Sequence, residues 1–115
     1  MDQTGASFTY AQKYLIPPIC VHTIIYMKIT FDPAKDESNL SKHGVSLALA
    51  AELEWDWLLA KTDTRRDYGE TRMVGLAPIG PRVFCVVYTD RGDERRMISL
   101  RKANTREVKY YASQI

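Results

Sequence analysis

The sequence predicts an α+β fold: a mainly antiparallel sheet with two N-terminal helices on one face and a short C-terminal helix. Two observations support this class. Helix signals gather in residues 32–57 and again after residue 103, while strand-like segments joined by short turns fill residues 58–102. Strands joined by short turns pair antiparallel, and helices grouped along the chain cover one face of a sheet. The opposite face is then expected to stay free.

The regular pattern begins at Met27, so one domain is expected over residues 27–115 and an N-terminal extension over residues 1–26. The extension is expected to be partly disordered or packed on the domain. Its apolar part, residues 14–26, contains two prolines and is too short to span a bilayer. It also lacks a clear signal-peptide cleavage site, and two cysteines make no disulfide framework. A cytoplasmic protein without membrane contact is therefore expected.

The first elements are marked by alternation and by capping residues. Residues 27–31 alternate apolar and polar side chains, which is typical of a strand. Asp32 is placed to cap a helix that begins at Pro33, and Gly44 is placed to end it. Ser46 is placed to open a second helix, because apolar residues follow it at helical spacing.

Strand-like segments follow until Ala103. They are residues 58–64, residues 73–77, residues 83–89, and a last strand after the turn at residues 90–93. Residues 83–89 are the most apolar stretch of the chain and are expected to form a central strand.

The last strand and the segment after it, residues 95–108, organise the expected site. Because strand side chains alternate, one face is expected to carry Ile98 and Leu100, and the other Arg95, Met97, Ser99 and Arg101. Asn104 can cap the following helix, and Glu107 completes a capping box. Guanidinium groups beside a serine suit phosphate better than a lipid or a sugar. The same pattern also fits solvated arginines on an open sheet face.

Charge is unevenly distributed along the chain. Residues 1–60 contain four Lys and Arg against seven Asp and Glu, whereas residues 61–115 contain twelve against seven. The basic half is mostly arginine, which binds phosphate through a fixed fork of donors. This asymmetry favours an anionic partner such as nucleic acid.

Chemistry-bearing motifs are few. The two histidines and two cysteines lack metal-site spacing, and neither a glycine-rich phosphate loop nor a nucleophile elbow is present, so no metal or cofactor is expected. What remains is a set of arginines with polar partners: Arg65, Arg66, Tyr68, Glu70, Arg72, Tyr88, Arg91, Arg95, Arg96, Ser99, Arg101 and Lys102. Such a set suits RNA cleavage by the 2′-hydroxyl, in which fixed donors stabilise charge on the phosphorane.

Proton transfer has weaker candidates. His43 is the only histidine in the regular part of the chain, but a histidine just before a helix-ending glycine equally serves as an electrostatic cap. Tyr68 and Tyr88 fit packed rings with a wet hydroxyl as well as a catalytic role. Glu70 fits a salt bridge to Arg72 across a turn.

Three segments together carry a family resemblance: FDPAKDESNLSKHGVS (31–46), DTRRDYGETRMVGL (63–76) and RRMISLRKANTREVKYY (95–111). They resemble the BrnT toxins of bacterial type II toxin–antitoxin systems, from about residue 27 to residue 111. The resemblance implies a RelE-like fold and a ribonuclease that blocks translation. It also implies neutralisation by a BrnA-type ribbon-helix-helix antitoxin. The complex of the two proteins, for which a heterotetramer is one expected assembly, is expected to bind promoter DNA only through the antitoxin.

The family pattern is carried over by position. Its KHG motif corresponds to Lys42, His43 and Gly44, its arginine-bearing strand to Arg72, and its last motif to Arg96, Ile98, Ser99, Arg101, Lys102 and Ala103. The expected catalytic set is Arg72, Arg96 and Arg101 for phosphate, His43 for proton transfer, and Tyr68 and Glu70 behind it. Further RNA contacts are expected from Lys42, Arg65, Arg66, Arg91, Arg95, Ser99 and Lys102.

Two other classes of function fit the same residues. The domain can be a nucleic-acid-binding module without catalysis, since arginines contact phosphate in either case. It can also be an interaction protein whose basic face holds an acidic antitoxin.

Overall fold

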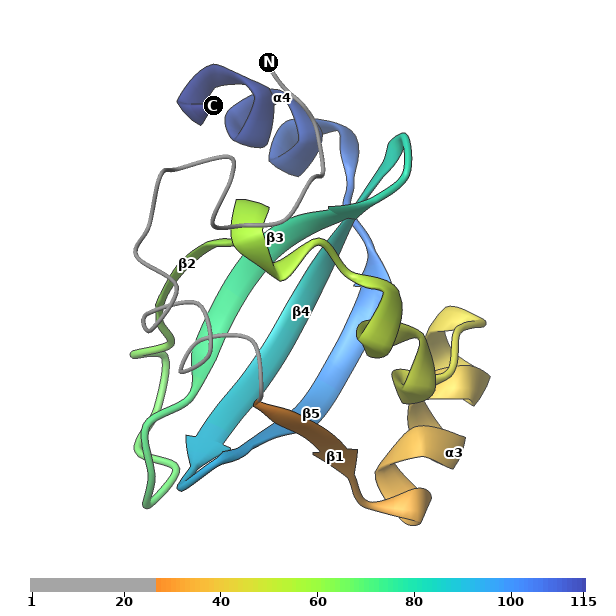
Figure 1. The fold of residues 1–115 in the computed structure, drawn as a ribbon, viewed down its shortest axis with the longest axis vertical. Helices are drawn as coiled ribbons and strands as arrows, with labels where there is room; N and C mark the ends of the chain where they lie inside the picture. The colour runs from red at the N-terminus through yellow and green to blue at the C-terminus, as the bar shows by residue number, and fades with distance from the viewer. Residues whose placement is uncertain (1–26) are drawn as a thin grey trace, which may run out of the picture.

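The computed structural model describes residues 27–115, and the expected extension of residues 1–26 lies outside the described residues. The elements follow in the order β1 (Lys28–Phe31), α3 (Pro33–His43), η1 (Leu47–Glu52), η2 (Trp55–Trp57), β2 (Leu59–Thr62), β3 (Met73–Ile79), β4 (Arg82–Arg91), β5 (Glu94–Lys102) and α4 (Thr105–Gln114) (Figure 1). The α+β class is confirmed. None of the described helices is long and apolar enough to cross a membrane.

The five strands form one mixed sheet in the order β1-β5-β4-β3-β2. Strands β2 to β5 pair antiparallel with their neighbours, as expected from their short turns. β1 instead pairs parallel with β5, from Lys28 opposite Glu94 to Phe31 opposite Met97. Short turns could not predict this pairing, because β1 and β5 lie at opposite ends of the domain sequence.

The capping signals at both α-helices are confirmed. The Asp32 side chain accepts a hydrogen bond from the Ala34 backbone N–H, and Gly44 ends α3 in the left-handed region at φ 74°. At α4, Asn104 and Glu107 form the reciprocal capping box. These interactions join residues at most four apart, so the local sequence is sufficient to specify them.

The second predicted helix is wrong as an α-helix. Ser46 does begin helical structure, with its hydroxyl accepting from the Ala48 N–H, but the chain forms two short 3-10 helices, η1 and η2. The Glu54 N–H donates to the Pro78 carbonyl at 2.9 Å, and the Trp55 indole donates to the Ala50 carbonyl at 3.1 Å. Tertiary partners thus satisfy groups that a continuing helix would have used.

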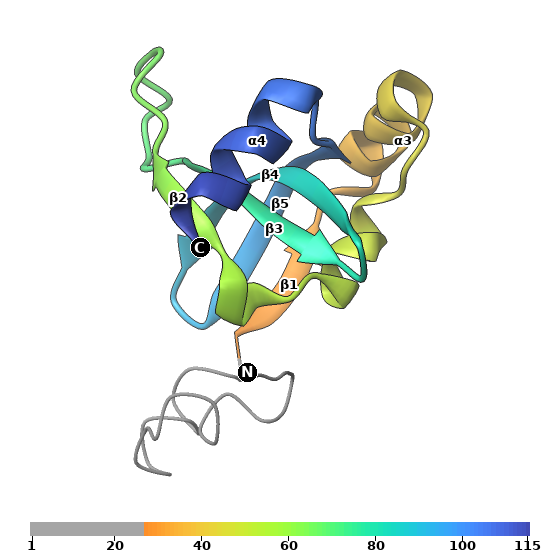
Figure 2. The same cartoon turned by 90° about the horizontal axis from the view of Figure 1, so that it is seen from above.

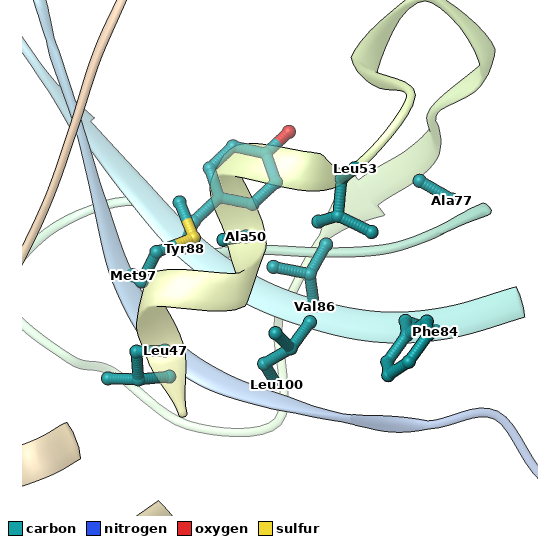
Figure 3. Packing of buried hydrophobic residues seen from close by; sticks show 9 residues of the cluster. All are labelled: Leu47, Ala50, Leu53, Ala77, Phe84, Val86, Tyr88, Met97 and Leu100. Atoms are coloured by element: carbon teal, nitrogen blue, oxygen red, sulfur yellow. The ribbon is translucent and has the colours of Figure 1, made fainter. Parts of the chain in front are cut away.

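One face of the sheet forms the main core (Figure 3). Leu47, Ala50 and Leu53 from η1 and the residue after it pack on strand residues of β3, β4 and β5, namely Ala77, Phe84, Val86, Tyr88, Met97 and Leu100. All nine are buried. α3 lies beside β5 (Figure 1). Part of the face that two α-helices were expected to cover is therefore covered by the 3-10 segment instead.

The opposite face is not left free, contrary to the prediction. α4 lies over one end of it (Figure 2). There Tyr111 packs with Leu76 and Cys85, and the Tyr111 hydroxyl donates to the Trp57 carbonyl at 2.7 Å. The period of α4 brings its one buried residue, Tyr111, onto the sheet. The rest of this face stays open.

A bulge in β5 changes which residues share a face. Met97 lies opposite Tyr88 and Ser99 lies opposite Val87, so Ile98 is an extra residue on β5. The predicted strict alternation is therefore wrong. Arg95, Met97 and Leu100 belong to the core side, whereas the open side receives Ile98, Ser99 and Arg101.

Candidate functional site

A cationic hollow of about 570 Å³ lies on the open part of the second sheet face, beside α4. Strands β2 to β5, the loop after β2 and α4 all contribute to it. Its charged lining consists of Lys61, Arg65, Arg72 and Arg101 with the carboxylates Asp63 and Glu107. Four cationic groups against two carboxylates leave the hollow with a positive charge that attracts anions.

Arg101 is held at the α4 side of the hollow by Glu107. The two guanidinium nitrogens Nη1 and Nη2 each donate to one carboxylate oxygen at 2.8 Å. Glu107 Oε1 also accepts the Asn104 backbone N–H at 2.9 Å, so one carboxylate both caps α4 and orients the arginine. The hydrogen bonds from Arg101 hold the pKa of Glu107 below its usual range.

Asp63 organises the loop between β2 and β3. Its side chain is 2 % exposed and accepts hydrogen bonds from Arg65 Nε at 2.9 Å, Arg65 Nη2 at 2.8 Å and the Tyr68 hydroxyl at 3.1 Å. Its backbone N–H donates to the Arg72 carbonyl at 2.7 Å. The hydrogen bonds from Arg65 hold the pKa of this carboxyl well below its usual range, so it stays ionised.

Arg72 differs from the other arginines of the hollow. Its guanidinium carbon lies 4.1 Å from the centre of the Tyr68 ring, and its Nε–H is buried without a hydrogen-bond partner. Among the described residues no carboxylate pairs with it, whereas Arg65 pairs with Asp63 and Arg101 with Glu107. Stacking on an aromatic ring fixes the plane of the guanidinium and leaves its terminal nitrogens for an anionic ligand.

A smaller pocket of about 260 Å³ adjoins the hollow at Ile98 and Ser99. Its other side is the last part of α3, including Lys42 and His43. The buried Asn39 side chain attaches this helix to β5, since its Nδ2 donates to the Leu100 carbonyl at 2.7 Å and its Oδ1 accepts the Leu100 N–H at 3.0 Å. His43 and Arg101 therefore line adjoining pockets that share Ser99.

The structure brings together part of the expected site. The cationic hollow takes Arg65, Arg72, Ser99 and Arg101, and the adjoining pocket takes Lys42 and His43. Tyr68 supports Arg72 from behind. Like Tyr68, six further expected residues line neither space: Arg66, Glu70, Arg91, Arg95, Arg96 and Lys102.

Three of these residues form ion pairs that the sequence did not predict. Glu70 pairs with Arg91 at 2.9 Å, not with Arg72. Arg95 lies on the core side, where it pairs with Asp90 at 2.8 Å and stacks on Trp55 and Tyr88. Tyr88 itself is buried, and burial raises the pKa of its hydroxyl, so it is a packed ring and not a group of the hollow.

Sequence reasoning missed three supporting residues. Asp63 had a local signal, because an aspartate two residues before an arginine can accept both its backbone and side-chain N–H. Glu107 was identified as a cap but not as the partner of Arg101. Asn39 had a weak signal, a helix-interior asparagine, which is unfavourable unless its amide has partners.

The described residues contain no group of three or more His, Cys, Asp or Glu that could hold a metal ion. Positive charge in the site is supplied by arginine and lysine side chains. The fold and the hollow thus define a small α+β protein with an arginine-lined cationic hollow, whose donors suit anionic groups such as phosphate.

The family comparison identifies the chain more closely. Residues 31–107 match the family described as "Ribonuclease toxin, BrnT, of type II toxin-antitoxin system". This match covers most of the chain, and the protein belongs to the BrnT family of ribonuclease toxins, with RNA as substrate and an antitoxin as partner. A search of curated proteins finds no match.

Proposed function

We propose that the cationic hollow binds the scissile phosphodiester of RNA and that the protein cleaves it without a metal ion. Arg72 is the observation that carries this proposal, because its guanidinium lines the hollow, is stacked on Tyr68 and has no carboxylate partner among the described residues, which leaves its terminal nitrogens for a phosphate. Ser99 and Arg101 lie in the same hollow and supply further donors.

The proposed reaction is transfer of the phosphoryl group to the neighbouring 2′-oxygen. The 2′-hydroxyl loses its proton and its oxygen bonds to phosphorus, the bond from phosphorus to the 5′-oxygen breaks, and that oxygen takes up a proton. Arg72 and Arg101 stabilise the charge of the phosphorane, and removal of one such donor typically lowers the rate about 10²–10³-fold. His43 exchanges a proton with the substrate from the adjoining pocket, and Tyr68 positions Arg72.

Arg96 and Glu70 receive no role in this scheme. Arg96 lies opposite Thr30 and Thr89 in the sheet, and Glu70 is paired with Arg91, with both outside the two pockets. Arg66 and Lys102 are exposed and can add phosphate contacts along the chain of the RNA.

The test uses purified protein, separated from its antitoxin, with RNA in EDTA. Arg72→Ala should lower cleavage about a hundredfold or more, while Arg82→Ala, an exposed arginine outside the hollow, should leave the rate unchanged. Cleavage that EDTA abolishes would refute the arginine mechanism. Binding of RNA without cleavage by the native chain would instead favour a non-catalytic module.

We further propose that the antitoxin is a BrnA-like ribbon-helix-helix protein, that the two form a heterotetramer, and that promoter DNA is bound only through the antitoxin. A RelE-like relationship of the fold and a cytoplasmic location belong to the same proposal. The support is the family match together with the net positive charge of residues 61–115. Light scattering of the co-expressed complex measures its stoichiometry, and a mobility shift with and without antitoxin tests the route to DNA.

Residues 27–115 are proposed to be sufficient for activity. Both pockets and the matched residues 31–107 lie within this range. A chain that begins at Met27 should cleave RNA at the rate of the full chain, and a truncated chain that is folded but inactive would contradict this.

A further inference from the structure

A slot of about 230 Å³ lies beside the cationic hollow, between β2, β3 and α4. We call it the α4 slot. Its floor is apolar and consists of Leu59, Val74, Leu76 and Cys85. Lys61, Val74, Cys85 and Glu107 line both the slot and the hollow, so the two form one continuous surface.

Tyr110 of α4 lines the slot. It is 55 % exposed, and its ring and hydroxyl have no partner among the described residues. The neighbouring Tyr111, by contrast, is buried and bonded to the Trp57 carbonyl. α4 thus uses one tyrosine to attach itself to the sheet and presents the other over an apolar slot.

The chemistry of the slot suits a flat, uncharged ring. Burial raises the pKa of the Cys85 thiol, so the floor remains neutral. Lys61 is exposed at the junction with the hollow and can donate to a ring acceptor or to a phosphate. Proteins that bind single-stranded RNA combine these parts: cationic side chains hold the backbone, and an exposed aromatic ring stacks on a base.

We propose that the α4 slot binds the nucleobase adjoining the phosphate in the cationic hollow, with Tyr110 stacked on it. This inference rests on the proposed function, because the hollow fixes the phosphate from which the base extends. The continuity of the two surfaces and the small volume of the slot favour a single base over a peptide segment. Tyr110 would then contribute to the choice of cleavage site.

The direct test is stacking, measured on a short single-stranded RNA in which 2-aminopurine replaces one base. Binding to the native chain should quench its fluorescence, and Tyr110→Phe should preserve the effect. Tyr110→Ala should abolish the quenching and weaken RNA binding at least about fivefold, since one stacked base contributes that much or more. Val108→Ala is the matched control, because Val108 is also partly exposed on α4 but lines neither pocket.

Cleavage measurements separate this inference from the proposed function. Tyr110→Ala should shift the base preference of cleavage, whereas Arg72→Ala should lose cleavage and keep the quenching. Unchanged binding, quenching and preference in a Tyr110→Ala chain that still cleaves would overturn the slot and leave the arginine site in place. Tyr110-dependent quenching without cleavage would support the slot and refute the catalytic proposal. A variant impaired only in antitoxin binding would assign the slot to a protein contact and overturn the inference.

Discussion

The two faces of the sheet use the same strands for opposite purposes. On the core face, β4 and β5 bury Val86, Met97 and Leu100 against the 3-10 segment, and little is accessible to solvent (Figure 3). On the other face, α4 covers only one end, and the remaining surface holds the cationic hollow. The bulge at Ile98 separates the two functions within β5, because it directs two consecutive residues to the open face.

Arginine content alone therefore does not locate the site. Within residues 27–115, four arginines have carboxylate partners, Arg65, Arg91, Arg95 and Arg101, and two of these line the hollow. Arg72 is stacked, lacks a carboxylate partner among the described residues and faces the hollow. A charge is most available to a ligand where it faces the hollow and the fold leaves it without an internal partner, as at Arg72.

The largest effect should come from the core face of β5. Leu100→Ala removes a fully buried side chain and should lower the free energy of unfolding by about 2–5 kcal/mol. Ile98→Ala, at the partly exposed bulge position, should cost clearly less. Urea denaturation followed by circular dichroism measures both, and equal losses would contradict the division of β5 into two faces.

Substitution of Arg101 should have a smaller effect in free energy, and this effect should fall on cleavage and not on stability. Arg101→Ala should lower RNA cleavage about a hundredfold, equivalent to about 2.7 kcal/mol, and relieve growth arrest in cells that express the chain without antitoxin. Because the Arg101–Glu107 pair is partly exposed, stability should change by less than about 1 kcal/mol. A folded and fully toxic variant would remove Arg101 from the site.

The contribution of Glu107, on the open face, to the free energy of unfolding should depend on pH. Its pKa is lowered in the folded protein by the hydrogen bonds from Arg101, so its contribution to stability is present above the pKa of the unfolded chain. That contribution is lost as the pH falls through the lower, folded value. Glu107→Gln should be about 1 kcal/mol less stable at pH 7, from weaker capping, and the difference from the native chain should shrink toward pH 3. A difference independent of pH would contradict this role.

The last and smallest effect is expected at His43. If His43 exchanges protons with the substrate, His43→Gln should remove one limb of the pH–rate profile. If it only caps α3, the same change should lower stability by about 1 kcal/mol or less and leave the profile intact. That second outcome would exclude His43 from catalysis while keeping the arginine site.

Local sequence determined much of the fold. The Asp32 and Gly44 limits of α3, the capping box of α4, and the strand segments with the turn at residues 90–93 were predicted, because their causes lie within a few residues. The three segments of the family resemblance likewise lie in the matched residues 31–107. Of the candidate site, the sequence identified Arg72, Ser99 and Arg101, which do line one hollow.

Only the tertiary structure decided the rest. The parallel pairing of β1 with β5, the 3-10 form of η1 and the place of α4 depend on partners far away in the chain. An alternation rule does not predict the bulge at Ile98. One extra residue there reverses the sheet face to which the earlier residues of β5 belong. The tertiary structure also decides which arginines remain available to a ligand. The pairing of Arg91 with Glu70, for example, joins residues 21 positions apart. Such contacts depend on the relative placement of the strands, which no short sequence pattern specifies.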